Sequence, residues 1–151
     1  MTSHDHLAEL HEQAADRLHG DGQRYTPQRR LLVGLLAELD QPVTIPQLLE
    51  HQPDLAQSSA YRNLAVLERA GVVHRIVTTD EFARYELTED LTEHHHHHLI
   101  CESCGDVSDF TVPHQVEADL EAAVAKVARR TGFTVTDHRF DLVGTCARCS
   151  A

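Results

Sequence analysis

Apolar residues in the first 70 positions recur every three or four residues, the spacing that gathers side chains on one face of a helix. The pattern predicts helices over residues 3–19, 27–40 and 45–52, and a fourth that ends at Gly71. Thr26 and Thr44 are suited to be N-caps, each with a proline within the first two helical positions. Ser58 or Ser59 is suited to cap the fourth helix.

Beyond Gly71 the pattern changes from helical spacing to alternation. Residues 73–77 and 82–86 alternate in polarity, which predicts two strands joined by a turn at residues 79–81. Three or four helices followed by such a hairpin are typical of a winged helix-turn-helix. A small helical domain with an incidental hairpin is the alternative.

The second half of the chain has a different organisation. Residues 89–93 are polar and acidic and are predicted to be a linker or hinge. The pattern beyond them predicts strands at 98–101 and 107–112, a helix at 116–130 and a strand at 134–143. The sequence therefore predicts an α+β protein, with a winged helix in residues 1–88, a hinge at 89–93 and a second domain at 94–151. This second unit is too small to be stable alone, so we expect it to need metal, a partner subunit, or both.

The distribution of charge differs between the halves. The net charge is −11, which argues against a nucleic-acid binder if only the sum is considered. However, residues 1–79 carry seven arginines and ten acidic residues, whereas residues 80–151 carry six basic and fourteen acidic residues. A divalent cation in the second half would offset part of its self-repulsion.

The sequence gives no sign of a membrane or secretory segment. No apolar run approaches the roughly 18–20 residues that span a bilayer. Residues 1–10 lack the basic start and apolar stretch of a secretory signal. We therefore expect a cytoplasmic protein, in which cysteines stay reduced and need another role.

The four cysteines form two C-x-x-C pairs, Cys101/Cys104 and Cys146/Cys149, each at the end of a predicted strand. Four thiolates are the tetrahedral set that Zn²⁺ prefers. We therefore predict a structural zinc site. A redox dithiol switch is the alternative, although one pair would suffice for it.

Residues 94–98 are five consecutive histidines. On an extended segment His96 and His98 face one way while His95 and His97 face the other, so each pair is suited to a separate metal centre. Solvated, non-binding histidines are the alternative. Further candidate ligands are His74 and Glu86 on the hairpin side, and His138 with Glu117 or Glu121 on the other.

Several short motifs occur in a recognisable order over residues 22–149. They are Tyr25-Thr-Pro-Gln-Arg29, Ser59-Ala-Tyr-Arg-Asn-Leu64, Tyr85-Glu-Leu-Thr88, His94 through Cys101, Cys104-Gly105, Gly132-Phe133 and Cys146-x-x-Cys149. In this combination the chain resembles the ferric uptake regulator superfamily of metal-dependent transcriptional repressors. The resemblance implies a homodimer with N-terminal winged helices and C-terminal dimerisation domains, so residues 94–151 become the metal-binding dimerisation domain.

The resemblance also implies two metal sites besides the cysteines. The regulatory site would use Glu86, His96 and His98, with His74 where zinc-sensing members place an acidic ligand. The second site would use His95, His97, His138 and one helix glutamate. Spacing to Gly132 favours Glu121, whereas spacing from Cys104 favours Glu117.

By the same resemblance the fourth helix is the recognition helix. Its N-terminal end offers hydrogen-bonding groups suited to the major groove. Arg24, ahead of the second helix, and Arg29 and Arg30 in its first turn are suited to hold phosphates. The candidate DNA contacts are Arg24, Tyr25, Arg29, Gln57, Ser58, Ser59, Tyr61 and Arg62. For Tyr61 the alternative is a half-buried core tyrosine.

Two departures from the family pattern bear on the sensed metal. Gln41 stands where iron-sensing members often have histidine, and Glu86 stands where peroxide sensors carry aspartate. The regulatory ion is expected to be Zn²⁺ or Fe²⁺, with Ni²⁺ and Mn²⁺ also compatible with imidazole and carboxylate ligands.

The predicted function is a repressor that binds double-stranded operator DNA as a homodimer when the hinge site is filled, controlling metal-homeostasis genes. We do not expect an enzyme, because the candidate residues fill metal shells and leave no obvious base. The alternative is a metal-buffering or delivery protein without metal-dependent DNA binding.

Overall fold

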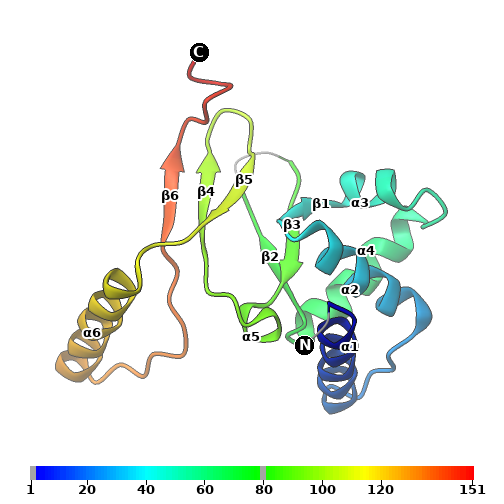
Figure 1. Cartoon of the computed structure of the whole chain (residues 1–151), viewed down its shortest axis with the longest axis horizontal. Coiled ribbons are helices and arrows are strands. Elements are labelled where there is room, and N and C mark those ends of the chain that lie inside the picture. The colour runs from blue at the N-terminus through cyan, green and yellow to red at the C-terminus, as the bar shows by residue number, and fades with distance from the viewer. Residues whose placement is uncertain (1–2, 79–80) are drawn as a thin grey trace.

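The computed structural model describes residues 3–78 and 81–151 (Figure 1). The first half contains four helices and a small antiparallel sheet of strand order β1-β3-β2. Its elements are α1 (Ser3–Gly20), α2 (Pro27–Leu39), β1 (Val43–Thr44), α3 (Ile45–His51), α4 (Gln57–Arg69), β2 (Val73–Ile76) and β3 (Arg84–Leu87). The predicted turn at 79–81 lies partly outside the described residues. Helices followed by a β2–β3 hairpin give the winged-helix arrangement predicted from the sequence.

Helices α2 and α3 begin where their caps predict. Thr26 is the N-cap of α2, and its hydroxyl accepts a hydrogen bond from the backbone N–H of Arg29. Thr44 and Gln47 form a reciprocal capping box at α3, in which the Gln47 side chain accepts from Thr44 N at 2.8 Å.

The predicted serine cap of α4 is wrong. The helix begins at Gln57, and its N-cap is Ala56, which has no acceptor in its side chain. Leu55 and Ala60 occupy the two positions of a hydrophobic staple, and both are buried. Burial of this apolar pair therefore fixes the start of the helix, and Ser58 and Ser59 fall inside its first turn.

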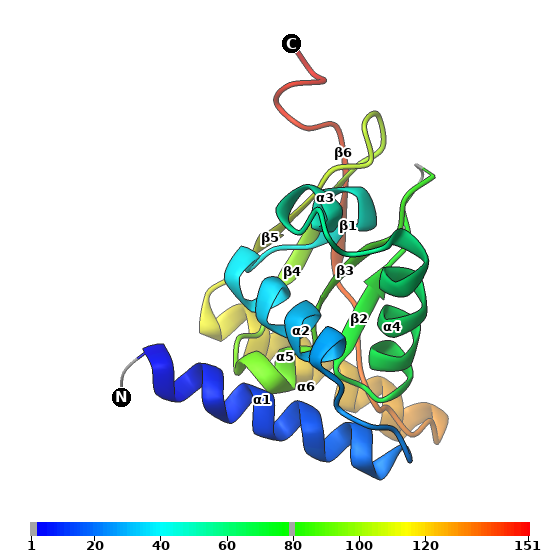
Figure 2. The ribbon, with the colours of Figure 1, turned by 90° about the vertical axis from the view of Figure 1, so that its right-hand side faces the viewer.

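The core of the first half lies where α1, α2 and α4 meet the three-stranded sheet. Leu18 of α1, Leu32 of α2 and Leu64 of α4 have no solvent exposure, and each contributes about 1.5–3 kcal/mol by leaving water. Figure 2 shows α1 lying along one edge of this helical layer, next to α5. Helix α1 is thus part of the domain core.

The second half is a three-stranded sheet of order β5-β4-β6 with one long helix. Its elements are α5 (Glu89–Thr92), β4 (His97–Cys101), β5 (Val107–Phe110), α6 (His114–Thr131) and β6 (Asp141–Gly144). Strand β4 pairs antiparallel with β5 and parallel with β6. The segment predicted to be a linker contains a short helix, α5.

The last strand is shorter than predicted. It covers Asp141–Gly144 and not residues 134–143, so His138 precedes the strand. The reason lies in the partner strand. Because β4 begins at His97, and His98 is paired with Asp141, residues well before Asp141 have no strand to pair with.

Helix α6 lies on the opposite side of the molecule from α1–α4 (Figure 1). In α6, all of which the structure describes, no side chain is buried. Together with the following segment and β6 it exposes large apolar side chains: Val116, Val127, Phe133, Val135, Phe140, Leu142 and Val143. Within residues 3–78 and 81–151, every helix is too short or too polar to cross a bilayer.

Candidate metal centres and DNA-facing helix

The four cysteines come together at one end of the second sheet. The β4–β6 register pairs Cys101 with Gly144, which brings the two C-x-x-C turns side by side. All four sulfur atoms lie within 4.8 Å of one another, and all four thiols are free. Cys104 Sγ and Cys146 Sγ are 3.9 Å apart. Tetrahedral Zn²⁺ with Zn–S bonds of about 2.3 Å requires ~3.8 Å between sulfurs, so the cluster fits a structural zinc site.

The backbone prepares one of the four sulfurs, that of Cys101, for a cation. The N–H of Cys146 donates to Cys101 Sγ at 3.3 Å. This bond and a second one from the backbone of Cys104 lower the pKa of Cys101 to about 6. A thiolate is the form that binds metal, so this sulfur is ready for coordination at neutral pH.

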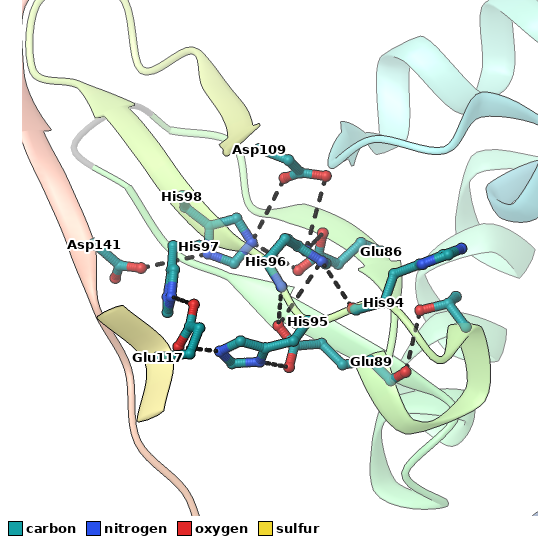
Figure 3. Close-up of polar contacts among 11 residues, drawn as sticks. Glu86, Glu89, His94, His95, His96, His97, His98, Asp109, Glu117 and Asp141 are labelled. Atoms are coloured by element: carbon teal, nitrogen blue, oxygen red, sulfur yellow. Dashed lines mark hydrogen bonds and ion pairs between the residues drawn. The ribbon is translucent and has the colours of Figure 1, made fainter. Parts of the chain in front are cut away.

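A first histidine–carboxylate cluster joins the two halves of the chain (Figure 3). Glu86 on β3 has one carboxylate oxygen 2.8 Å from His98 Nε2 and the other 3.1 Å from His96 Nε2. Asp109 on β5 lies 3.8 Å from both nitrogens. The four ligand atoms lie within 4.8 Å of one another, and Glu86 and His98 are buried. Two imidazoles and two carboxylates in this arrangement are suited to a divalent transition metal.

Asp109 was missed in the sequence analysis. It faces His98 directly across the β4–β5 pair, a position set by strand register. His74 is paired with Glu86 in the hairpin and lines the same cavity. Among the described residues, however, His74 does not belong to the group of ligand atoms within 4.8 Å. The structure therefore brings together Glu86, His96 and His98 as proposed, with Asp109 in the place considered for His74.

The electrostatics of this cluster are those of paired ions. Burial alone would lower the pKa of His98, but the hydrogen bond and charge of Glu86 outweigh it and raise that pKa. Burial likewise opposes ionisation of Glu86, but its hydrogen bonds and charge interactions with His98 and His96 lower its pKa. The surroundings of Glu86 thus favour positive charge beside its carboxylate. A bound divalent cation would supply that charge while His96 and His98 coordinate it as neutral imidazoles.

A second cluster lies on the other face of the histidine run. His97 Nε2 is 2.6 Å from Glu117 Oε1, and His95 Nε2 is 3.3 Å from Glu117 Oε2. These three ligand atoms also lie within 4.8 Å of one another. The alternation predicted for the run is present in the structure, because His95 and His97 belong to one cluster and His96 and His98 to the other.

Glu117, not the favoured Glu121, completes this cluster. Helix α6 begins at His114, so Glu117 falls in its first turn near β4, whereas Glu121 lies one turn further and is exposed. His138 packs beside the cluster, with its ring centroid 5.6 Å from that of His95. In the part of the chain that the structure describes, buried His138 Nε2 has no hydrogen-bond partner. A buried ring nitrogen without a partner next to this set fits a cation.

Helix α4 presents a polar face to solvent. Gln57, Ser58, Tyr61 and Arg62 are exposed, while Ser59 is partly buried. Tyr61 is 50% exposed and lies outside the hydrophobic core of the first half. This face is accessible to a partner along the whole N-terminal half of the helix.

The candidate contacts around the start of α2 differ from one another. Arg24 is exposed, but Arg29 donates from Nε to Asn63 Oδ1 at 3.1 Å and from Nη1 to the Arg24 carbonyl at 2.5 Å. Tyr25 Oη is joined to His11 Nδ1 by a 2.6 Å hydrogen bond, and burial raises the pKa of Tyr25 to about 12. Tyr25 and Arg29 therefore hold α1, α2 and α4 together.

A winged helix joined to a small sheet with a four-cysteine cluster and two histidine–carboxylate clusters defines a DNA-binding type of fold with metal-binding capacity. The chain belongs to the ferric uptake regulator family, whose sequence profile matches residues 20–143. The ferric uptake regulation protein of Bacillus subtilis is 31% identical to this chain over 140 residues. The aligned region covers 89% of this chain and 90% of that relative.

Solved structures show the same fold. The structure of the Helicobacter pylori ferric uptake regulator, described as having three functional metal binding sites, superposes with a TM-score of 0.72 at 21% sequence identity. The superposition covers 96% of this chain and 94% of the Helicobacter pylori chain. A zinc uptake regulator in complex with zinc and DNA has a TM-score of 0.58 at 25% identity, covering 99% of this chain and 97% of its own. These relatives are transcriptional regulators and not enzymes.

Proposed function

We propose that this chain is a metal-responsive transcriptional repressor that binds operator DNA as a homodimer when the first histidine–carboxylate cluster holds a divalent ion. The observation that carries the proposal is the position of Glu86. It lies on a wing strand of the N-terminal half, and its two oxygens contact His96 and His98 of the other half. An ion bound there would tie residues 1–88 to residues 94–151 across the hinge at 89–93.

The expected effect of the ion is a shift of population. With the cluster empty, the winged helices of a dimer sample several orientations. Ligation by Glu86, His96, His98 and Asp109 favours the conformers in which the wing is held against β4 and β5. Only an ion with differential affinity for these conformers changes DNA affinity, and DNA must in turn tighten metal binding.

The other two clusters have supporting roles. The cysteine cluster holds Zn²⁺ that pins the C-terminal segment to the sheet. His95, His97 and Glu117, with His138 beside them, hold a second ion between β4 and α6. For the regulatory ion, two nitrogen and two oxygen ligands suit Zn²⁺ or Fe²⁺, and Ni²⁺ or Mn²⁺ are compatible.

The DNA and dimer parts of the proposal rest on two surfaces. The exposed face of α4, with Gln57, Ser58, Tyr61 and Arg62, supplies hydrogen-bonding and charged groups of the kind that read a major groove. The apolar face of α6, its following segment and β6 is suited to a second copy of the chain, because exposed apolar patches commonly mark interfaces. The relative solved with DNA supports the same use of the fold.

The test is metal-dependent operator binding. Protein that retains its cysteine-bound zinc is titrated with a palindromic operator in buffered Zn²⁺, Fe²⁺, Ni²⁺ or Mn²⁺. One ion is expected to restore specific binding, and His96→Ala to abolish the response. His94→Ala is the matched control, because His94 is an exposed neighbour outside both clusters. Metal binding without any change in DNA affinity would favour a metal-buffering protein and overturn the proposal.

A further inference from the structure

The carboxylate of Glu89 lies between the two histidine clusters (Figure 3). Glu89 is the first residue of α5, in the segment between the two halves of the chain. Its Oε2 is 2.6 Å from His95 Nδ1, and its Oε1 accepts a hydrogen bond from the backbone N–H of His96 at 3.1 Å. His95 belongs to the second cluster and His96 to the first. One carboxylate thus contacts both.

The His95 ring lies against two carboxylates, of which that of Glu89 is the closer. Because Glu89 Oε2 lies 2.6 Å from Nδ1, nearer than Glu117 lies to Nε2, the proton is favoured on Nδ1 and Nε2 becomes the metal-binding atom. That Nε2 is the atom 3.3 Å from Glu117 Oε2. Carboxylates that orient ligating histidines in this way are a recurrent feature of metal sites, and Glu89 itself lies outside the three groups of ligand atoms.

The contact with His96 acts on the backbone. It holds the peptide just ahead of β4, at the point where the chain leaves α5 for the strand. A change in the position of Glu89 therefore moves the backbone of His96. The side chain of the same residue places its Nε2 in the first cluster.

The same short helix is tied to the recognition helix. Asp90 accepts from Arg17 Nη2 at 2.6 Å, and Arg17 Nη1 donates to the carbonyl of Gly71 at 2.5 Å. Gly71 directly follows α4 and its C-cap. Helix α5 therefore contacts both metal clusters through Glu89, and Arg17 of α1 links it to Gly71, just beyond the end of α4.

We propose that Glu89 is a positioning residue that couples the two histidine clusters, presetting His95 for the second ion while holding the backbone of His96 for the first. This inference rests on the proposed metal binding of both clusters. On this proposal the second ion also affects the first cluster. Filling the second site orders Glu89 through His95, and Glu89 in turn fixes the backbone of His96, which carries a regulatory ligand.

The first test uses the protein without ions at the histidine clusters. In ¹⁵N-histidine NMR spectra the neutral His95 ring is expected as the Nδ1–H tautomer, with its signals assigned by their loss in His95→Ala. Glu89→Ala should shift His95 toward the Nε2–H form, and Glu93→Gln should leave it unchanged. Glu93 ends the same helix and has the same charge, but makes neither contact. An unaltered tautomer in Glu89→Ala overturns the proposal.

The second test uses Co²⁺ as the probe in zinc-retaining protein. With the first cluster disabled by His96→Ala, Glu89→Ala should weaken Co²⁺ binding at the second cluster by about 10–100-fold, the usual effect of losing such a partner. Glu89→Gln keeps a hydrogen-bond acceptor, so its Co²⁺ affinity at the second cluster should lie between that of Glu89→Ala and that of Glu93→Gln. In the chain with both clusters intact, filling the second cluster should tighten Co²⁺ binding at the first, and Glu89→Ala should remove that gain.

The outcomes separate the two proposals. If the unsubstituted chain binds no Co²⁺ at the histidines, the proposed metal function fails and the coupling fails with it. If the unsubstituted chain binds both ions but Glu89→Ala matches Glu93→Gln in affinity and coupling, only the role of Glu89 is overturned.

Discussion

Arg17 of α1 links α5 to Gly71, just beyond the end of α4. The geometry of these contacts predicts how much stability the chain loses when Arg17 is replaced. Arg17→Gln removes the bond to the Gly71 carbonyl at 2.5 Å and the ion pair with Asp90 at 2.6 Å. The Gly71 carbonyl keeps one partner, because Thr88 Oγ1 also donates to it at 3.0 Å. No buried acceptor is therefore left unpaired by the substitution.

Arg17 Nη1 also lies 3.2 Å from Thr88 Oγ1, and that contact is the longest of the three. The two shorter contacts differ in value. The Asp90 side chain is 69% exposed, so the ion pair contributes at most ~1 kcal/mol. The bond from a charged donor to the partly buried Gly71 carbonyl contributes about 1.5 kcal/mol. Arg17→Gln should therefore lower the free energy of unfolding of the N-terminal half by ~2 kcal/mol.

The assay is urea unfolding of zinc-containing protein. With a slope of about 2 kcal/mol per M, the midpoint should fall by ~1 M. Arg69→Gln is the matched control, since Arg69 pairs with Asp21 at 3.3 Å and its side chain is 58% exposed. That variant should lose no more than ~0.5 kcal/mol. The reasoning is refuted if Arg17→Gln and Arg69→Gln unfold at the same urea concentration.

Three further predictions concern the clusters. Without added metal, the pairing of His98 and Glu86 should stabilise the fold most between the ordinary pKa values of 4.5 for Glu and 6.5 for His. That contribution should be lost as pH rises through the raised pKa of His98 or falls through the lowered pKa of Glu86. Urea midpoints against pH test this, and a slope above pH 6.5 that Glu86→Gln does not reduce would contradict it. Asp109→Ala should weaken metal binding at the first cluster at least ~10-fold in a competition titration, against Asp119→Ala as control; equal affinities would remove Asp109 from the ligand set. Cys149→Ser should release zinc and expose residues after β6 to protease while the far-ultraviolet circular dichroism of α1–α4 persists, and zinc retained at full stoichiometry would argue against the four-thiolate site.

Much of the first half could be predicted because its signals are local. Threonine caps and leucine spacing fix α2 and α3 within a few residues of sequence. The start of α4 was misjudged because a buried pair, Leu55 and Ala60, outweighs the capping preference of serine. Strand β1 was missed because it has two residues and exists only through its pairing with β3.

The errors at the metal sites have a different origin. The types of ligand follow from the histidine run and the alternation of a strand, which are readable in the sequence. Asp109 and Glu117 depend on the register between β4 and β5 and on where α6 begins, and neither is set by nearby residues. His74 was a reasonable candidate because it pairs with Glu86, yet adjacency in a hairpin does not bring its ring nitrogen to the ligand group.

Five identical side chains in a row have a consequence for how β4 is aligned. A slip of one residue in a strand exchanges its two faces, and varied sequences resist this because the wrong side chains then meet the wrong neighbours. Within residues 94–98 a slip would still present imidazole to both faces, so the run itself gives little resistance. The alignment must be enforced downstream, where Cys101 is held opposite Gly144 and bonded to the backbone of Cys146. The position of the cysteine cluster therefore sets the register of β4, and that register determines which face each histidine occupies.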